Sequence, residues 1–362
     1  MEKIEEIALF PLVRADNKPM IRLNAVQREG LDRVKQKLNR GLYKTTENIC
    51  LCGNSDRGII ISEKDRFGLS FKFVLCKTCS LIRTDPVLDH DSLMAFYQDD
   101  FSQMYRGNIK ATEEYFKMAL SQGQMFLRLL SRLSMMDEIQ NILEIGCATG
   151  SNLYPFYQMG KKVTGYDYDE HYLSFGKNLG MNLIKGDYKE NVPENSQDLV
   201  ILSHVLEHFK DPVTETVSII GKVKTNKYLL VAVPGIFNIA NTYFSPALYF
   251  QNDHIYHFHE AYLKVFFRGL GMEIIYSDEN CRFVLRKPKA WNAADARFKY
   301  ERSLDGKYKE VALYLKRVHL LNKFLPYSRI KISARKWLVL IFEKLGCRDY
   351  VNKIAEKIGL VK

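Results

Sequence analysis

The feature that most constrains the fold is a series of short apolar segments, separated by longer amphipathic stretches, that begins at Asn141. The segments read NILEIG, KVTGYD, DLVILS and KYLLVAVPG, and MEIIYS and CRFVLRK follow near residue 280. Buried strands that alternate with helical stretches are typical of a parallel sheet covered by helices. The sequence therefore predicts an α/β fold whose central sheet is flanked by helices.

The first of these strands runs into a glycine-containing turn. Glu144 lies near the strand end, and Gly146 and Gly150 bracket the turn into the next helix. Glycine lets the backbone approach a ligand closely, and a helix start offers unpaired N–H groups. A dinucleotide-binding G-x-G-x-x-G would need glycine at Ala148 and Ser151, so a pyrophosphate is not the expected ligand. A carboxylate before the first glycine fits a cationic, amino-acid-bearing ligand better.

Acidic residues follow at the ends of the next two strands. Asp167 ends KVTGYD, 23 residues after Glu144, where an acid is expected to hydrogen-bond ribose hydroxyls. Asp187 ends IKGD, where it is placed to bind an adenine amino group. A single strand-end aspartate is often only a helix cap. The order and spacing of these residues together indicate a nucleoside site.

These motifs resemble those of the class I methyltransferases that use S-adenosylmethionine. LEIGCATG resembles their first motif, with Ala148 where glycine is commoner; YDYD, KGD, the stretch from Asp198 to Pro212 and VAVPG resemble the following motifs. The resemblance covers roughly residues 90–287 and implies a Rossmann-like sheet. The cofactor contacts that it implies, with the neighbouring positions included, are Glu144, Gly146, Cys147, Ala148, Gly150, Asp167, Tyr168, Asp187, Ser203 and His204.

Four of the seven cysteines form two close pairs ahead of this region. Cys50 and Cys52 are separated by one residue, and Cys76 and Cys79 by two. Four thiolates can share a tetrahedral zinc ion, and a closed four-cysteine site is structural rather than catalytic. The alternative is four packed thiols. Cys147, Cys281 and Cys347 have no partner by spacing.

A narrower resemblance comes from the segments FVLCKTCSLIRTDP, AFYQDDFSQMYRG and NDHIYHFHEAYLKVFFRGLG. Together with the cysteine module they resemble the sugar methyltransferases of bacterial surface-polysaccharide and deoxysugar pathways, including nucleotide-sugar C-methyltransferases. The resemblance implies a sugar nucleotide or lipid-linked glycan as acceptor, with O- or C-methylation left open. It also implies proton transfer by Asp253, His254 and Tyr105, although Asp253 stands where glutamate is more usual.

Several histidines compete for the role of general base. His254 is preferred because Asp253 is adjacent, and His257 and His208 are the competing candidates. His204, Glu207 and His208 would share one face of a helix. This patch is similar to the Glu-x-x-Glu-His magnesium site of quinone-pathway O-methyltransferases, but His204 replaces the first glutamate, so a helix-lining role is the preferred interpretation.

The net charge of +11 is concentrated at the C-terminal end. Residues 286–362 hold twenty basic and seven acidic side chains, whereas the other 285 residues carry a net charge of −2. This part is interpreted either as a solvated helical tail or as a contact for a polyanion or an anionic membrane face. An RNA methyltransferase and a non-catalytic scaffold are the rival functions. Nucleic acid is not expected, because no aromatic-interleaved basic groove or base-flipping motif is present.

The predicted organisation has four parts. Residues 1–46 form a leader with one helix, on which Leu31, Val34, Leu38 and Leu42 share a face. Residues 47–88 form a zinc-binding domain, 89–287 the methyltransferase domain, and 288–362 a basic helical extension. No stretch reaches the roughly eighteen apolar residues of a membrane helix, and the N-terminus is unlike a secretory signal. The expected location is therefore cytoplasmic, with a peripheral position at the inner membrane face as the alternative.

Overall fold

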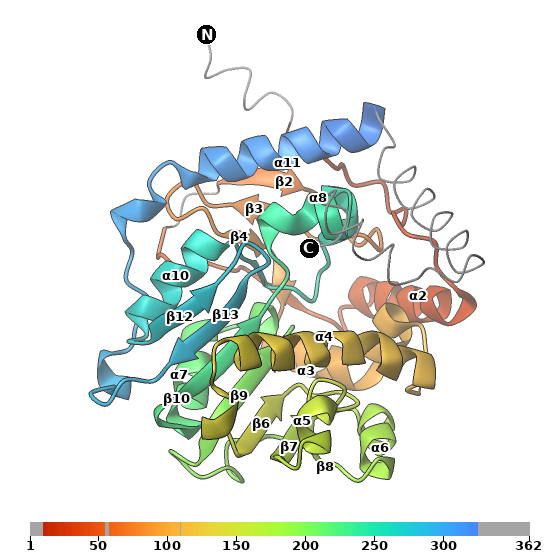
Figure 1. Ribbon diagram of the computed structural model, residues 1–362. Coiled ribbons are helices and arrows are strands. Elements are labelled where there is room, and N and C mark those ends of the chain that lie inside the picture. The colour runs from red at the N-terminus through yellow and green to blue at the C-terminus, as the bar shows by residue number, and fades with distance from the viewer. Residues whose placement is uncertain (1–9, 55–57, 109, 325–362) are drawn as a thin grey trace, which may run out of the picture.

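The computed structural model describes residues 10–54, 58–108 and 110–324. Over these residues the chain forms a seven-stranded sheet, a four-stranded sheet and a two-stranded pair, with helices packed around them (Figure 1). The predicted α/β fold with a central sheet flanked by helices is confirmed. The sheet is mixed rather than wholly parallel, because its last two strands run antiparallel to their neighbours.

The large sheet has the strand order β12-β13-β10-β9-β6-β7-β8. Strands β6 to β10 pair in parallel. The order changes direction at β6, which pairs with both β7 and β9. In open α/β sheets, ligands bind beyond the carboxyl ends of the strands at such a point. The strands are β6 (Asn141–Ile145), β7 (Lys162–Asp167), β8 (Asn182–Lys185), β9 (Gln197–Ser203), β10 (Val223–Ala232), β12 (Glu273–Ser277) and β13 (Arg282–Arg286).

Alternate residues of the central strands belong to two separate apolar clusters, one on each face of the sheet. Leu143 and Val200 belong to one apolar cluster, whereas Ile142 and Leu199 belong to the other. Successive side chains of a strand point to opposite faces, so both faces of this sheet are buried. On the second face lie α4 (Glu113–Arg132), α5 (Tyr154–Gln158) and α6 (Glu170–Asn178); on the first lie α7 (Pro212–Lys222) and α10 (Glu260–Gly269).

Helix α4 covers the segment before β6 and has defined ends. Thr112 caps its start by accepting a hydrogen bond from the backbone of Tyr115. The helix ends at Arg132 because Ser134 takes a left-handed backbone conformation, with φ of 56°. Its buried Phe126 and Leu130 pack toward the large sheet, so α4 covers strands β6 and β9 on that face (Figure 1).

The cysteine-bearing segment forms a sheet together with a strand from the part of the chain that also forms the large sheet. Its strands are β2 (Ile59–Ser62), β3 (Phe73–Leu75) and β4 (Ile82–Thr84), and the fourth strand of their sheet is β11 (Tyr256–His257). A two-stranded pair, β1 (Thr45–Thr46) with β5 (Val87–Leu88), lies beside them. Segment 47–88 therefore shares a sheet and an apolar core with residues far along the chain.

The N-terminal helix α2 (Ala25–Asn39) packs against a short π-helix, η1 (Ser102–Arg106). A Cβ on Gly30 would stand 3.1 Å from the backbone nitrogen of Met104, so the two elements touch closely. Leu31 and Val34 are buried as predicted, but the helix ends at Asn39 and Leu42 is exposed. Helix α3 (His90–Asp99) connects this layer to the cysteine-bearing segment.

Short helices and α11 complete the described chain. Helix α11 (Lys307–Phe324) buries Val311, Leu315 and Val318, so the first part of the predicted C-terminal extension packs on the body of the protein. The amphipathic stretch KWLVLIFEKLG and Cys347 lie outside the described residues. The remaining elements are η2 (Met136–Glu138), η3 (Leu206–His208), η4 (Ile236–Asn238), α8 (Ile239–Thr242), α9 (Pro246–Tyr249), η5 (Ala293–Asp295) and η6 (Arg302–Leu304).

Among the described helices, none has both the length and the apolar character needed to cross a membrane.

Candidate functional site

The turn after β6 has the backbone shape that its glycines suggest. Gly146 and Gly150 both have φ of +70°, and Ala148 has φ of 46°. The Ala148 N–H donates to Oδ2 of Asp167 at 2.8 Å. Asp167, at the end of β7, therefore stabilises the conformation of the turn. Only glycine adopts this region without cost. The alanine at 148 is therefore held in a conformation that favours glycine, which agrees with glycine being commoner there.

The side chains of Val205 and Cys147 lie on different sides of this turn. A Cβ on Gly146 would stand 2.6 Å from Cγ2 of Val205, so the loop after β9 packs directly on the turn. Cys147 points the other way, because its Sγ would lie 2.6 Å from a Cβ on Gly165 in β7. The contribution of Cys147 to a ligand site is thereby limited to its backbone.

Glu144 is a buried carboxyl with one oxygen left without a partner. Asn152 Nδ2 donates to Oε1 at 2.7 Å, while Oε2 has no hydrogen-bond partner among the described residues. Burial raises the pKa of Glu144 to about 8. A buried polar atom without a partner is costly, and a cationic or hydrogen-bond-donating ligand would satisfy it. The arrangement fits the predicted cationic, amino-acid-bearing ligand.

The predicted nucleoside contacts lie along the same edge of the sheet. Asp167 uses both oxygens locally, since Oδ1 also accepts from the Asp169 N–H at 2.9 Å. Tyr168 and Asp187 are exposed, and Asp187 Oδ1 accepts from the Lys189 N–H at 3.0 Å. Each carboxylate oxygen can accept a second hydrogen bond, so these acids keep capacity for ribose or adenine.

The loop after β9 joins this edge to a second polar cluster. Ser203 Oγ accepts a hydrogen bond from Gln122 of α4 at 2.8 Å. His204 takes φ of 57°, and its side chain is about half exposed. The residues that follow form one turn of 3₁₀-helix, η3, rather than the predicted α-helix face. His204 Nδ1 nevertheless lies 3.4 Å from Glu207 Oε1.

Glu207 is the centre of the second cluster. Its Oε1 lies 3.8 Å from His254 Nε2 and 4.0 Å from His208 Nε2. The side chain is 1% exposed, and within the described part of the chain neither carboxylate oxygen has a hydrogen-bond partner. Burial lowers the pKa of His254 well below its ordinary value, so this imidazole is neutral near pH 7. The loop thus carries a buried carboxylate faced by histidines.

Asp253 is paired differently from the expectation. The sequence pairs it with the adjacent His254, but its Oδ2 lies 3.6 Å from Nδ1 of His208. The nearest carboxylate of His254 is instead Glu207, because Asp253 and His254 direct their side chains to different neighbours. Burial raises the pKa of Asp253 above its ordinary value. The acid–histidine pair is therefore Asp253 with His208.

Tyr105 and His257, two further catalytic candidates, lie beside this cluster. The Tyr105 hydroxyl donates to Asn252 and accepts from the Asp253 N–H at 3.4 Å. His257 is 1% exposed and packs its ring against Phe73 and Phe250. Burial lowers the pKa of His257 to about 3, and neither ring nitrogen has a hydrogen-bond partner in the residues described by the structure.

The comparisons with known proteins agree on one domain. Residues 113–277 match the family model described as a methyltransferase domain. This part of the chain is similar to a methyltransferase domain. The predicted enzyme class is thereby confirmed, and the glycine turn, the Glu207 cluster and Asp253 all lie inside the matched residues. No curated protein matches the chain.

Several solved methyltransferase structures are similar to this chain at low identity. One is 1,6-didemethyltoxoflavin-N1-methyltransferase from Burkholderia thailandensis, at 14% identity and a TM-score of 0.43 over 58% of this chain and 95% of that one. Magnesium protoporphyrin IX methyltransferase from Synechocystis matches at 14% identity with a TM-score of 0.40. The match covers 55% of this chain and 98% of that one. A SAM-dependent methyltransferase from Archaeoglobus fulgidus matches at 19% identity with a TM-score of 0.36. The match covers 62% of this chain and 92% of that one.

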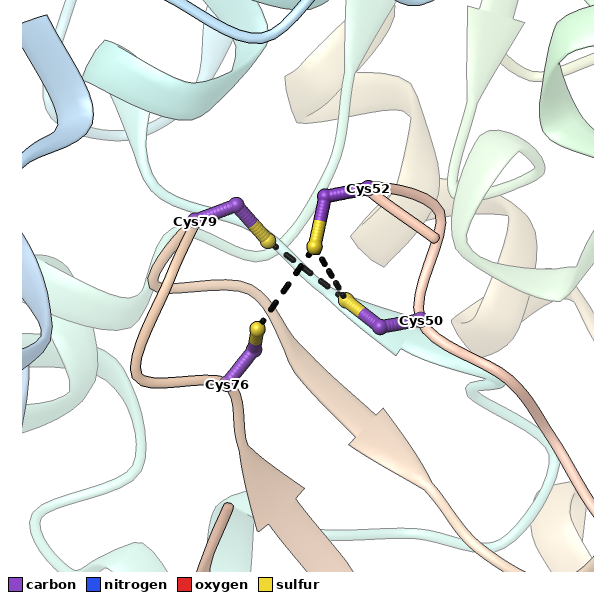
Figure 2. A group of neighbouring side chains, drawn as sticks. All are labelled: Cys50, Cys52, Cys76 and Cys79. Carbon is purple, nitrogen blue, oxygen red and sulfur yellow. Dashed lines mark hydrogen bonds between the residues drawn. The ribbon is translucent and has the colours of Figure 1, made fainter. Parts of the chain in front are cut away.

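Ahead of the methyltransferase domain, the two cysteine pairs come together as the spacing predicts. Their four Sγ atoms point toward one another from two loops (Figure 2). Cys50 Sγ lies 3.5 Å from Cys79 Sγ, and Cys52 Sγ lies 3.6 Å from Cys50 and 3.7 Å from Cys76. Zinc–sulfur bonds of about 2.3 Å in a tetrahedron place the sulfurs about 3.8 Å apart. The cluster has the dimensions of a closed zinc site.

The other described cysteines lie away from this cluster. Cys147 and Cys281 are buried, and burial raises the pKa of both thiols well above the ordinary value. Neither is among the residues that gather around a common centre.

Sequence reasoning did not select several polar residues of the methyltransferase site. Glu207 was placed on a helix face, yet it is the carboxylate on which the histidines converge. The Tyr97 hydroxyl lies 2.9 Å from His208 Nδ1. No motif or spacing in the sequence indicates that Tyr97 belongs to the site. Asn152 and Gln122 are also missed, because contacts from other elements cannot be read from local spacing. An acidic residue directly before a histidine was the one available clue to Glu207.

Proposed function

We propose that this chain transfers a methyl group from S-adenosylmethionine to a hydroxyl-rich acceptor, a sugar nucleotide or a glycan precursor. One observation carries the proposal: the loop that holds Glu207 and His208 packs against the glycine turn through Val205 and Gly146. A group suited to proton transfer therefore lies beside the turn that would hold the methyl donor. The two halves of a methyl transfer, alignment and proton removal, are adjacent.

The donor side is built for a cationic nucleoside. Glu144 offers a buried oxygen without a partner, which an ammonium group would satisfy. Asp167 and Asp187 stand at the ends of neighbouring strands, where ribose and adenine are expected. Bound S-adenosylmethionine would supply a methyl group already activated by its sulfonium. The protein's task is then to orient the acceptor in line with that methyl.

The acceptor side is rich in buried polar groups from residues 251–254. Asn252, Asp253 and His254 are all buried, and Asp253 Oδ1 has no hydrogen-bond partner among the described residues. Arg66 stacks its guanidinium over the Tyr105 ring at 5.5 Å, and its Nε also has no partner. Carboxylates and imidazoles suit sugar hydroxyls, and a guanidinium suits a phosphate. This supports a sugar nucleotide better than an apolar acceptor.

In an O-methylation, the acceptor oxygen forms a bond to the methyl carbon while the carbon–sulfur bond breaks. The electron pair of that bond stays on sulfur, and S-adenosylhomocysteine leaves. The hydroxyl proton passes to the His208–His254–Glu207 cluster and then to water. In a C-methylation of a keto sugar, the same cluster would remove the proton from the carbon beside the carbonyl.

We infer that the four clustered cysteines hold a structural zinc ion. Four thiolates fill a tetrahedral shell, so no position is left for a substrate. The residues that surround the cluster link β3 and β4 to the catalytic half through β11. Zinc bound there would stabilise the sheet that carries His257 and, three residues earlier, His254.

Calorimetry and a transfer assay test this function. The full chain is titrated with S-adenosylmethionine, then incubated with the labelled donor and a set of sugar nucleotides or RNA. We expect saturable donor binding, label transfer to a sugar nucleotide, and competition by unlabelled sugar nucleotide but not by RNA. Donor binding with transfer only to RNA would contradict the acceptor, and failure to bind the donor in folded protein would contradict the function.

A further inference from the structure

We propose that Glu207, His208 and His254 bind a divalent transition-metal ion on the acceptor side of the methyltransferase domain. The role suggested for this ion rests on the proposed function, whereas the site itself is argued from the side chains alone. One ligand atom from each of the three residues lies within 4.8 Å of the others. Apart from the cysteines, no other such group occurs among the described residues.

The separations are those of an unfilled coordination shell. Glu207 Oε1 lies 3.8 Å from His254 Nε2 and 4.0 Å from His208 Nε2. Both distances are too long for hydrogen bonds. Metal–nitrogen and metal–oxygen bonds of about 2.0–2.2 Å in a tetrahedron place the ligand atoms about 3.3–3.6 Å apart. The two distances from Glu207 Oε1 exceed these values by roughly 0.2–0.7 Å, and the three ligand atoms all lie within 4.8 Å of one another.

The Glu207 carboxylate needs a partner that its surroundings do not provide. It is 1% exposed, and neither oxygen has a hydrogen bond to any residue that the structure describes. Burying an unpaired carboxylate is costly, so such groups are normally paired or bound to a metal. A bound cation would satisfy both the carboxylate and the imidazole lone pairs.

His208 is already oriented as a ligand. Its Nδ1 lies 2.9 Å from the Asp253 carbonyl oxygen, to which an Nδ1–H would donate. That tautomer leaves Nε2 as a bare lone pair on the side of Glu207. Metal-binding histidines usually donate their other N–H to a carbonyl or carboxylate in this way. The Tyr97 hydroxyl, also 2.9 Å from Nδ1, helps to hold the ring in place.

Gln251 is the group that competes for His254. Its side-chain nitrogen lies within hydrogen-bond reach of His254 Nε2, while its Oε1 is buried without a partner. A half-turn of the amide would remove that hydrogen bond and present Oε1 to the same space. Gln251 would then offer an additional oxygen ligand. The amide is therefore compatible with an ion once it has turned.

The donor set selects the class of ion. Two imidazoles and one carboxylate favour Zn²⁺, Co²⁺, Mn²⁺ or Fe²⁺ over Mg²⁺ and Ca²⁺, which prefer oxygen. Three protein ligands leave an open position, as in catalytic metal sites. His204, half exposed and 3.4 Å from Glu207 Oε1, lies at the exposed side of the cluster. An acceptor hydroxyl in the open position would lose its proton at lower pH. With the ion bound, that proton would pass directly to water, because the ion occupies the imidazole lone pairs that would otherwise accept it.

Cobalt titration of the full chain tests the site without any assay of activity. The protein is stripped with a chelator, and Co²⁺ is added while its visible absorption is followed. Thiolate ligands give intense charge-transfer bands, whereas a nitrogen–oxygen site gives only weak d–d bands. We expect two Co²⁺ ions per chain, one with each kind of spectrum.

Matched variants assign the second ion. Glu207→Gln and His254→Asn are expected to lose the nitrogen–oxygen spectrum and to weaken that binding about 100-fold or more, while the thiolate bands remain. His90→Asn, at an exposed position on α3, is the control and should retain both spectra. A wild-type spectrum that contains only thiolate-bound Co²⁺, or one that is unchanged in Glu207→Gln, would overturn the proposal.

Thermal unfolding gives a second readout if a variant folds poorly. Ions that bind only the folded state raise its melting temperature in a concentration-dependent way. With the cysteine site already loaded with zinc, added Mn²⁺ or Co²⁺ should raise the melting temperature of wild type but not of Glu207→Gln. Equal shifts in both would contradict the site. Donor binding by calorimetry is scored separately, so failure of the methyltransferase proposal remains distinguishable.

Discussion

His208 and Asp253 meet in the buried polar cluster, with Nδ1 of the histidine 2.9 Å from the aspartate carbonyl oxygen and 3.6 Å from its Oδ2. One residue belongs to the loop after β9 and the other to the segment before β11. This contact links the methyltransferase sheet to the sheet that carries the cysteines. It also separates Asp253 from His254, whose nearest carboxylate is Glu207.

Gly146→Ala is expected to weaken S-adenosylmethionine binding by at least tenfold. A Cβ there would meet Cγ2 of Val205 at 2.6 Å, and φ of +70° disfavours any side chain by roughly 1–2 kcal/mol. Gly160→Ala is the matched control, since Gly160 has φ of +75° but no atom within 4 Å. Both variants should lose similar backbone stability in denaturant titrations. Only Gly146→Ala should lose donor affinity by calorimetry, and equal affinities would place the donor elsewhere.

Glu144 should release a proton when the donor binds near pH 7. Burial raises its pKa to about 8, so the carboxyl is protonated in the free protein, and a neighbouring cation would favour ionisation. Calorimetry in two buffers with different ionisation enthalpies measures this release. We expect up to one proton for wild type, none attributable to this site in Glu144→Gln, and wild-type behaviour in Glu138→Gln. Identical binding heats in both buffers would contradict it.

The raised pKa of Glu144 also determines how the free energy of unfolding depends on pH when no donor is bound. The folded value lies above the ordinary pKa of glutamate, so the folded state binds the proton more tightly. The contribution is fully present below about pH 4.5 and is lost as pH rises through about 8. Chemical unfolding at several pH values should therefore show a steeper loss for wild type than for Glu144→Gln. Parallel curves would mean that the carboxyl is not held in its neutral form.

The sequence was most informative where the chemistry depends on neighbours along the chain. Strand ends at Glu144, Asp167 and Asp187 follow from apolar periodicity, and they meet at one sheet edge because parallel strands align their carboxyl ends. The cysteine pairs were likewise readable, since each pair is local. Pairings between distant segments were not. The contact between His208 and Asp253, and the β11 strand in the cysteine-bearing sheet, depend on tertiary packing.

Zinc should remain bound when cysteines outside the cluster are replaced. Cys76→Ser removes one of four converging sulfurs, so metal analysis of reduced, untagged protein should show loss of that zinc and lower stability of the N-terminal segment. Cys281→Ser changes a buried thiol that lies outside the cluster and should keep the zinc. Equal zinc content in wild type and Cys76→Ser would show that the four thiols are simply packed.

In the proposed function, the buried histidine–carboxylate cluster serves the acceptor and the glycine turn serves the donor. The most direct measurement compares His254→Asn with wild type in donor affinity and in label transfer to the acceptor. His208→Asn and His257→Asn are assayed in parallel. We predict that His254→Asn keeps donor affinity within about threefold and lowers turnover by about 10²–10⁴, the usual loss when proton transfer is impaired. Near-normal turnover in both His254→Asn and His208→Asn would contradict the account.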